Sequence, residues 1–448
     1  MNSSAAPTRR HGRRIAVVGM AAAALFVGGA LGVGLIGDSA DSGPDRAASA
    51  APGRSALAVQ SVVAGAGLGA EIARLQARLA DEPADAAGWA TLGGAYVQQA
   101  RITVDPAYYP KAEGALKRSL ELNARDNLAA FLGMGALANA RHDFAGAVVW
   151  AKRAQAVSSY NPDAYAVLAD AYTQLGKPAQ ATAAVQRMLD LSPALPALTR
   201  GSYDLEQRGD LAGARALLNS ALKNSYVAAD IGFCRYYLGE LALNSGDLAE
   251  AARQYERGLD ADPQSATLRH GTAKVAALRG DTATAIGTYA DLVGRVPNPQ
   301  YLVEYGELLT KLGRTAEAAE QFALIETVHM LFTANGGQDE LSLAEYEADH
   351  GSATLAVRYA KAEWSRRESP VVADALAWAL HRAGKDAEAL RYADAALAHG
   401  WRNALFFHHR AEIHRALGDA ASAKADAARV REYNPRFDAE LPSFGRAT

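Results

Sequence analysis

The sequence predicts an all-α solenoid, a stack of about ten helix pairs in a right-handed superhelix, preceded by one transmembrane or signal helix. Three observations predict this fold class. A short phrase containing glycine recurs along the chain, an alanine follows each of these glycines at a constant distance, and an uncharged segment lies near the N-terminus. Half of the residues are hydrophobic, and alanine, the best helix former, is abundant.

The recurring phrase can be followed from residue 170 onward. Its glycines are Gly176, Gly209, Gly246, Gly280, Gly313, Gly351, Gly384 and Gly418. They are 33, 37, 34, 33, 38, 33 and 34 residues apart, and an alanine stands five residues after each, as Ala181 does after Gly176. A period near 34 residues is that of a helix–turn–helix repeat.

Each recurring residue of the phrase has a physical reason. The glycine ends the first helix, where a left-handed backbone is needed and glycine adopts it at the lowest cost. The alanine lies where the two helices of a pair cross, because only a small side chain fits there. A proline that cannot continue a helix follows the second helix. These prolines are Pro193, Pro263, Pro297 and Pro435.

These features resemble the tetratricopeptide family from about residue 86 to residue 435. The family pattern is W-x2-L-G-x2-Y, then a turn glycine, A-x3-F, alanine and proline. Residues 89–96 read WATLGGAY and match its first part. Residues 162–193, 232–263 and 298–330 match most of the pattern, with Tyr255 and Phe322 at the aromatic position of the last two.

Departures from the repeat divide the array. Residues 101–110 are an insertion between the helices of the first repeat, and His142 occupies the glycine position of the second. Residues 331–342 break the register and predict a loop. We therefore expect about seven repeats in residues 70–330 and about three in residues 343–448.

The N-terminus predicts export. Residues 1–14 form a basic tail with four arginines, and residues 15–37 contain no charge and are long enough to cross a bilayer as a helix. Basic residues before this segment place the C-terminal repeats outside the cytoplasm, with a single-pass anchor in the cell membrane. A cleaved signal and a secreted protein are the alternative. Residues 38–69 are small and polar and predict a flexible linker.

The resemblance implies that the first helices line a concave groove that binds a peptide or protein partner. Carrying the family's groove positions onto this chain gives a mixed aromatic and polar set. Its members are Arg200, Tyr203, Tyr236, Tyr237, Glu240, Asn244, His270, Lys274, Glu304, Glu307, Trp378, Arg382, His408, His409 and Glu412. Some of these aromatic residues could instead pack between repeats.

The remaining chemistry is sparse. The net charge of −3 does not favour nucleic acid, and the single cysteine, Cys234, excludes an internal disulfide. His408, His409 and Glu412 are too few and wrongly spaced for a motif of metal ligands. We expect a membrane-tethered or exported interaction scaffold for a peptide or protein, with no enzymatic activity, cofactor or metal. The alternative is an assembly factor on the same solenoid that binds a small ligand, a metal or a cell-envelope glycan.

Overall fold

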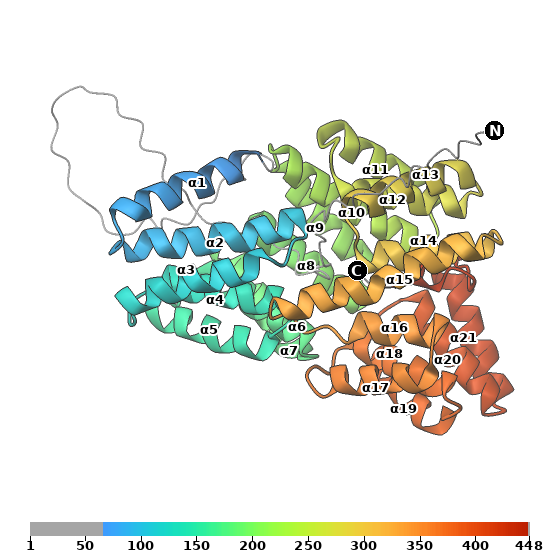
Figure 1. The fold of residues 1–448 in the computed structure, drawn as a ribbon. Helices are drawn as coiled ribbons and strands as arrows, with labels where there is room; N and C mark the ends of the chain where they lie inside the picture. The colour runs from blue at the N-terminus through green and yellow to red at the C-terminus, as the bar shows by residue number, and fades with distance from the viewer. Residues whose placement is uncertain (1–65, 447–448) are drawn as a thin grey trace, which may run out of the picture.

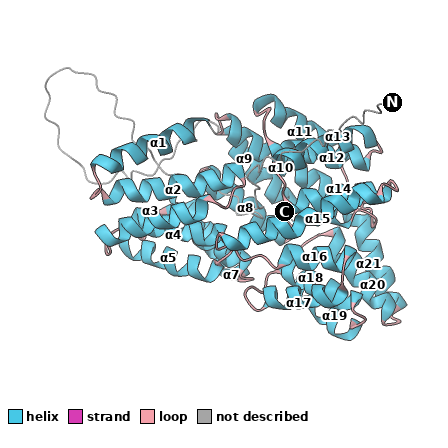
Figure 2. Ribbon diagram, in the orientation of Figure 1, coloured by secondary structure: helices cyan, strands magenta, loops and turns pink. Residues whose placement is uncertain are grey.

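The computed structural model describes residues 66–446, which form 21 α-helices and one short 3-10 helix (Figures 1 and 2). The expected basic tail and transmembrane or signal segment, residues 1–37, lie outside the described residues. So does most of the expected linker, but its last four residues are helical, because α1 begins at Ala66. None of the helices in residues 66–446 is both long and apolar enough to cross a membrane.

The helix bounds follow the predicted alternation. The first helices of the pairs are α2 (Ala86–Thr103), α4 (Leu128–Ala140), α6 (Pro162–Gln174), α8 (Leu195–Gln207), α10 (Ala228–Asn244), α12 (Ala266–Leu278), α14 (Pro299–Lys311), α16 (Leu341–His350), α18 (Pro370–Arg382) and α20 (Ala404–Ala416). The second helices are α3 (Tyr108–Leu122), α5 (Phe144–Val157), α7 (Pro178–Leu191), α9 (Leu211–Lys223), α11 (Leu248–Ala261), α13 (Thr282–Arg295), α15 (Thr315–Ala334), α17 (Ala353–Trp364), α19 (Asp386–Leu397) and α21 (Ala420–Tyr433). The additional helix α1 (Ala66–Asp81) packs on α2, so the 21 α-helices are ten pairs and one unpaired helix.

The turns between paired helices confirm most of the glycine prediction. Gly176 has φ +66°, and six of the other seven repeat glycines also have positive φ, whereas Gly351 has φ −131°. His142 takes the same left-handed backbone, with φ 61°, which fits its place in a glycine position. The aspartate that follows several of these glycines caps the second helix of the pair. In α11, for example, the Asp247 side chain accepts a hydrogen bond from Glu250 N and caps the helix.

The repeat alanines are buried between paired helices, as predicted. Ala214, Ala251 and Ala285 have no exposed surface, and the equivalent alanines of the other repeats are buried too. The second helices also end before the expected prolines. α7, for example, ends at Leu191, two residues before Pro193.

The two departures from the repeat are absorbed by longer helices. The insertion at residues 101–110 adds a last turn to α2 and the start of α3. The loop expected at residues 331–342 is shorter than predicted, because α15 continues to Ala334 and α16 begins at Leu341. α15 continues because Phe332 is buried on its extra turn, with its ring 6.2 Å from Tyr109 and 5.2 Å from His142.

The second part of the array, α16–α21, folds back against the first part. Four successive turns of the first part each lie against one loop of the second. These pairs are His142 with Gln338, Gly176 with Glu368, Gly209 with Gly400, and Gly246 with Pro435. The stack is therefore closed on itself rather than an open spiral.

The last described residues, 441–446, lie inside the molecule. After α21, residues 434–446 run along the inner face, and the short 3-10 helix Pro442–Gly445 contacts α14 and α20. This course brings the last residues of the chain onto the face where the sequence predicted a groove.

Candidate binding site

The predicted groove lies on the even-numbered helices, and much of it is engaged within the chain. Lys274 of α12 is completely buried, and its Nζ donates a 2.9 Å hydrogen bond to Glu240 Oε2 of α10. Tyr255 OH donates to Glu240 Oε1 at 2.6 Å. Removing two charges from water is costly unless their remaining polar atoms are satisfied. These residues therefore join successive repeats and present no charge to a partner.

A second buried set lies one repeat further along. His270 Nε2 contacts Glu304 Oε2, which also accepts a 2.8 Å hydrogen bond from Tyr289 OH. Gln300 Nε2 donates to Glu304 Oε1 at 3.0 Å. Burial alone would raise the pKa of the Glu304 carboxyl, but His270 and Lys274 hold it below its ordinary value. The carboxylate is thus kept charged by residues of its own fold.

The aromatic centre of the predicted groove is also covered, which corrects the expectation of an open surface there. Tyr236 is only 5% exposed and packs edge-on against Tyr237, with ring centroids 4.9 Å apart. Arg200 is buried and holds both carboxylate oxygens of Asp170 at 2.7 and 2.6 Å. Tyr236 packs among residues of α10, α11 and α12, and Asp170 belongs to the preceding repeat, so contacts within and between neighbouring repeats cover this face.

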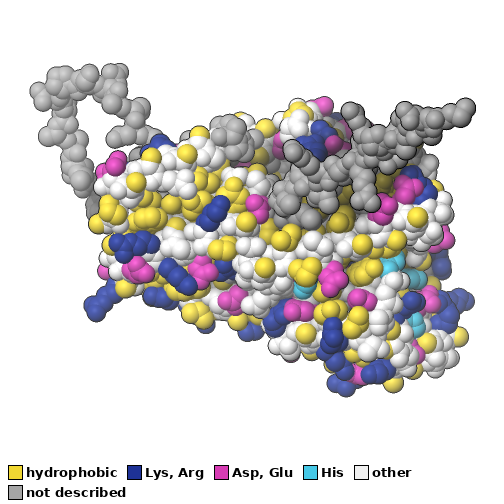
Figure 3. Space-filling model, in the orientation of Figure 1, with side chains coloured by type: hydrophobic (Ala, Val, Ile, Leu, Met, Phe, Trp, Pro, Cys, Tyr) yellow, Lys and Arg dark blue, Asp and Glu magenta, His cyan; other side chains and the backbone are white. Residues whose placement is uncertain are grey.

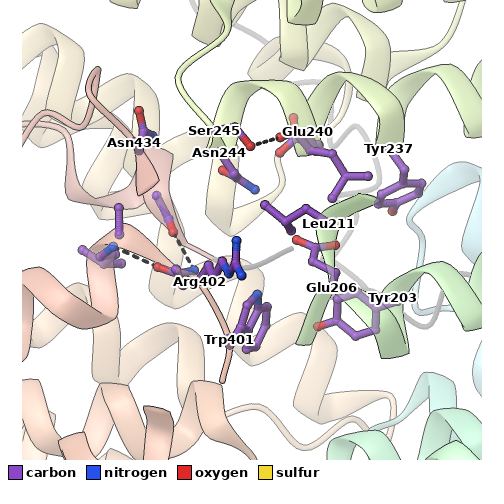
Figure 4. Close-up of a pocket in the computed structure, with 15 residues that line it drawn as sticks. Tyr203, Glu206, Leu211, Tyr237, Glu240, Asn244, Ser245, Trp401, Arg402 and Asn434 are labelled. Carbon is purple, nitrogen blue, oxygen red and sulfur yellow. Dashed lines mark hydrogen bonds between the residues drawn. The ribbon is translucent and has the colours of Figure 1, made fainter. Parts of the chain in front are cut away.

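A small cavity remains where the two parts of the array meet (Figure 4). Its volume is about 30 Å³, which is room for one or two waters and far less than a typical small-ligand pocket. Figure 4 shows Tyr203, Glu206 and Tyr237 on one side and Trp401 and Arg402 on the other. Asn244, another predicted groove residue, also lines it.

The C-terminal part of the predicted groove is built around Trp378. Its Nε1 donates a 2.7 Å hydrogen bond to Asp349 Oδ1, and its ring stacks on His409 at 4.1 Å. His409 Nδ1 lies 2.9 Å from Asp374 Oδ2. Arg382, at the rim of this face, donates from Nε to the Ala348 carbonyl at 3.0 Å. These residues fix one another and leave the outer ends of Trp378 and Arg382 accessible.

The histidines do not converge on a metal position. His408 Nδ1 and Glu412 Oε1 are 3.9 Å apart, and His409 turns instead to Asp374. Burial lowers the pKa of His408 to about 4. Within residues 66–446, the one group with suitable ligand atoms close together is Glu307, Asp349 and His350.

The atoms of that trio already have partners from the end of the chain. Ser443 donates to Glu307 Oε2 from its backbone N at 3.1 Å and also from its hydroxyl. Arg446 Nη2 donates to Asp349 Oδ2 at 2.7 Å, and His350 Nε2 lies 3.1 Å from Glu307 Oε1. A guanidinium and a hydroxyl thus stand where a cation would have to enter.

We call the inner face of α14, α16 and α20 the C-terminal groove, since residues 441–446 occupy it. Leu441 and Phe444 are buried there, and the Phe444 ring lies 6.3 Å from Tyr289. Asn403 Nδ2 donates to the Gly445 carbonyl at 3.2 Å. Arg446 Nε also lies 3.5 Å from Glu345 Oε2. The groove therefore holds a short peptide segment through apolar, backbone and charged contacts.

A separate, open hollow of about 430 Å³ lies at the other end of the array, between α1, α2 and α3. Trp89, Leu92 and Leu79 form its apolar walls, and Lys111 is its one lysine. Figure 3 shows hydrophobic side chains gathered over α1 and α2 on this side of the molecule. The hollow belongs to the first hairpin and is distinct from the C-terminal groove.

Comparison with known proteins identifies the repeat. Two family models, both described as tetratricopeptide repeat, match this chain. One matches residues 162–195, and the other matches residues 200–266, 236–298 and 270–327. The chain contains tetratricopeptide repeats. A comparison with curated proteins gives no match.

Solved structures with similar tetratricopeptide or helical architecture include a tetratricopeptide repeat protein from Parabacteroides merdae. It is 21% identical with a TM-score of 0.33, over 55% of this chain and 95% of that chain. The human IFIT1 dimer with PPP-AAAA is 14% identical with a TM-score of 0.45, over 82% of this chain and 86% of that one. The P58(IPK) tetratricopeptide domain is 14% identical with a TM-score of 0.27, over 84% and 91%.

The tetratricopeptide pattern placed the predicted groove residues on the first helices of the pairs but missed the residues that contact them. The predicted positions on α8–α14 do lie on neighbouring helices. Sequence reasoning missed Asp349, Glu345 and the tail residues Phe444 and Arg446. A signal was present in the segment PSFGR, which follows the last helix and combines an apolar ring with a cation.

Proposed function

We propose that this protein is an interaction scaffold that binds a peptide or protein segment in its C-terminal groove. Tetratricopeptide proteins generally mediate protein–protein interactions, and the family match covers the central repeats. The observation that carries the proposal is that this groove accommodates a peptide segment, residues 441–446, through side-chain and backbone contacts. A surface that already accepts one short segment has the shape and the polar groups to accept another.

We further propose that the scaffold is tethered to the cell membrane through residues 15–37, with the repeats outside the cytoplasm. Four arginines followed by 23 uncharged residues support this placement. Fractionation of the full chain, followed by protease treatment of intact cells, tests it. Recovery in the membrane fraction with cleavage from outside is expected. Recovery in the soluble cytoplasmic fraction would refute it, and secretion with a shortened N-terminus would favour a cleaved signal.

In-cell crosslinking followed by capture of the full chain tests the binding function. The variant pair Arg382→Glu and Glu412→Lys reverses two charges at the accessible rim of the groove. The matched control, Arg253→Glu with Glu432→Lys, reverses two exposed charges on α11 and α21. We expect a partner that crosslinks to α18 or α20 of the wild type and of the control, and that is not captured by the rim variant.

Two other results would count against this proposal. If the wild type and the rim variant recover the same partners in equal yield, the groove is not the binding surface. If no protein is crosslinked above the level of an unrelated exported protein, the scaffold function itself fails. The crosslinked peptides, identified by mass spectrometry, separate these two cases.

The alternative of a small-ligand or metal-binding assembly factor has less support. The enclosed cavity of about 30 Å³ is too small for an organic ligand, and the hollow of about 430 Å³ between α1, α2 and α3 is open, with Lys111 as its one charged side chain. The ligand atoms of Glu307 and Asp349 are already bonded to Ser443 and Arg446. Metal analysis of the untagged, purified full chain tests whether the protein is a metal-binding assembly factor. One bound ion per chain would favour that function over peptide binding.

A further inference from the structure

The segment that fills the C-terminal groove differs from an ordinary helix cap. A cap covers the apolar end of the last helix, whereas residues 441–446 contact α14 and α16, which lie far from them in sequence, as well as α20. Ser443 contacts Glu307, 136 residues earlier, and Arg446 contacts Asp349, 97 residues earlier. The segment therefore lies across the groove in the manner of a bound peptide.

The contacts along this segment have the pattern of ligand recognition. Phe444 is buried as an apolar anchor near Tyr289, and Ser443 and Gly445 make backbone hydrogen bonds to the groove. Arg446 places its guanidinium between the carboxylates of Glu345 and Asp349. The backbone contacts hold the turn in place, and Phe444 and Arg446 are the two side chains that the groove can distinguish.

The groove beneath the segment carries an excess of acid. Glu307 of α14 and Glu345 and Asp349 of α16 line the groove, and Asp374 lies beside it on α18; Arg446 pairs with Glu345 and Asp349, while His350 and His409 contact Glu307 and Asp374. The buried atoms Asp374 Oδ1 and His409 Nε2 have no hydrogen-bond partner. Without Arg446, Glu345 and Asp349 would lose the guanidinium that faces them, and a cation from a partner could take its place.

We propose that residues 441–446 are an internal ligand of the C-terminal groove, and that a partner segment with an apolar ring two positions before an arginine displaces them. The inference rests on the proposed function and specifies its partner. Phe444 and Arg446 define the spacing, because both are held by the groove at once. The partner is a flexible segment with at least one basic residue, since the groove itself is acidic.

Covalent connection makes this internal ligand a strong competitor. A flexibly tethered segment acts at an effective concentration of about 1 mM. Against a tail with an intrinsic Kd of about 1 µM, a free peptide with the same contacts would bind roughly 1000-fold more weakly to the intact chain. The tail therefore keeps the groove closed to weak ligands and admits only a partner that makes additional contacts or is held nearby.

Fluorescence polarisation with a labelled peptide tests the inference. The probe has the sequence of residues 436–448, RFDAELPSFGRAT, and the protein is the full chain in mild detergent. The variant Phe444→Ala with Arg446→Glu disengages the tail without removing it, and Arg429→Glu is a charge-matched control on an exposed face of α21. The expected result is probe binding at least 30-fold tighter to the tail variant than to the wild type or control.

The probe needs a control of its own, and a second experiment is needed in case the tail variant unfolds. A probe with glutamate in place of its second arginine should not bind. For the second route, a specific protease site replaces Asp438–Glu440, and the folded full chain is cut there. The cut tail should then exchange with the labelled probe within minutes to hours.

Three outcomes would overturn the inference. They are a tail variant with wild-type helicity that binds no probe, a glutamate probe that binds equally well, and a cut tail that never exchanges. Any of these, together with continued partner capture by the intact chain, would leave the proposed function standing. Loss of partner capture as well would remove both.

Discussion

Lys274 and Glu240 stand 34 residues apart, one repeat, and form a buried ion pair of 2.9 Å between the equivalent helices α12 and α10. The same offset relates His270 and Glu304. The repeat period thus places opposite charges at matching positions of successive repeats. The inner face is held together by these pairs rather than by hydrophobic contacts alone.

Breaking the Lys274–Glu240 pair from one side should be much worse than removing it entirely. Lys274→Met leaves a buried carboxylate without its cation, which costs about 3–5 kcal/mol of unfolding free energy. Adding Glu240→Gln neutralises that carboxylate and should restore most of the loss. Urea denaturation followed by circular dichroism measures both variants.

An exposed ion pair is the control for this experiment. Arg253 and Glu250 lie on the solvent side of α11, with the arginine side chain 54% exposed. Arg253→Ala should cost less than about 1 kcal/mol, because water and salt screen such pairs. If the Lys274 variant is no worse than this control, or the double variant recovers nothing, the pair is not structural.

Glu206 should make stability depend on pH. Burial, with a smaller contribution from the negative charge of Glu240, raises its pKa from 4.5 to about 7. As pH rises from 4.5 to 7, the unfolded chain loses this proton and the folded chain keeps it. Stability therefore falls over this range, by at most about 1.4 kcal/mol per pH unit. Tyr203, Tyr237 and Arg402 line the same cavity and face this carboxyl.

Glu206→Gln stays neutral at every pH and should remove that loss. The melting temperature of the variant relative to the wild type should rise between pH 5 and pH 8. Glu250→Gln, a change on an exposed face, is the control and should show no such trend. A difference between Glu206→Gln and wild type that is constant with pH would mean that this carboxyl is ionised in the folded protein.

The sequence predicted the repeat because its determinants are local. Gly176 is needed for a left-handed turn within one hairpin, and Ala181 for the close crossing of the same two helices. Each requirement recurs every repeat, so the pattern is visible without any tertiary contact. The same holds for Pro193, which follows the end of α7.

The folding back of the second part of the array was not predicted, because its contacts are not local. The pattern placed Tyr236 on an inner helix face, where Tyr237 and Tyr255 pack against it, but it gave no sign that α16–α21 fold back against the turns of the first part. The contact of Asn434 with the Leu243 carbonyl, 191 residues apart, has no periodic signature. The opposite charges of Lys274 and Glu240 at equivalent positions were the available hint that this face is filled from within.

Cys234 should be almost unreactive in the folded protein. Burial raises the pKa of its thiol from 9.0 to about 12, and only the thiolate reacts with thiol reagents. It is the single cysteine of the chain, so a colorimetric thiol reagent reports on it alone. At pH 8 the folded chain should react at least ~100-fold more slowly than the chain in urea. Equal rates would show that the α10 environment opens readily.

The contact between the two parts of the array can be tested with two glycines that share one backbone conformation. Gly176 has φ +66° and Gly313 has φ +74°. Alanine at either position must adopt a left-handed backbone, which costs about 1–2 kcal/mol. A Cβ at Gly313 would meet nothing within 4 Å, whereas a Cβ at Gly176 would overlap the backbone of Glu368 in the loop after α17.

Gly176→Ala should therefore cost more than Gly313→Ala, by about 1–3 kcal/mol, because the two parts must separate to admit the methyl group. Chemical denaturation gives the difference, and hydrogen exchange locates it. Amides of residues 366–369 should exchange faster in Gly176→Ala and at the wild-type rate in Gly313→Ala. Equal costs and unchanged exchange in both variants would mean that the loop after α17 does not press on the Gly176 turn in solution, and that the array is open there.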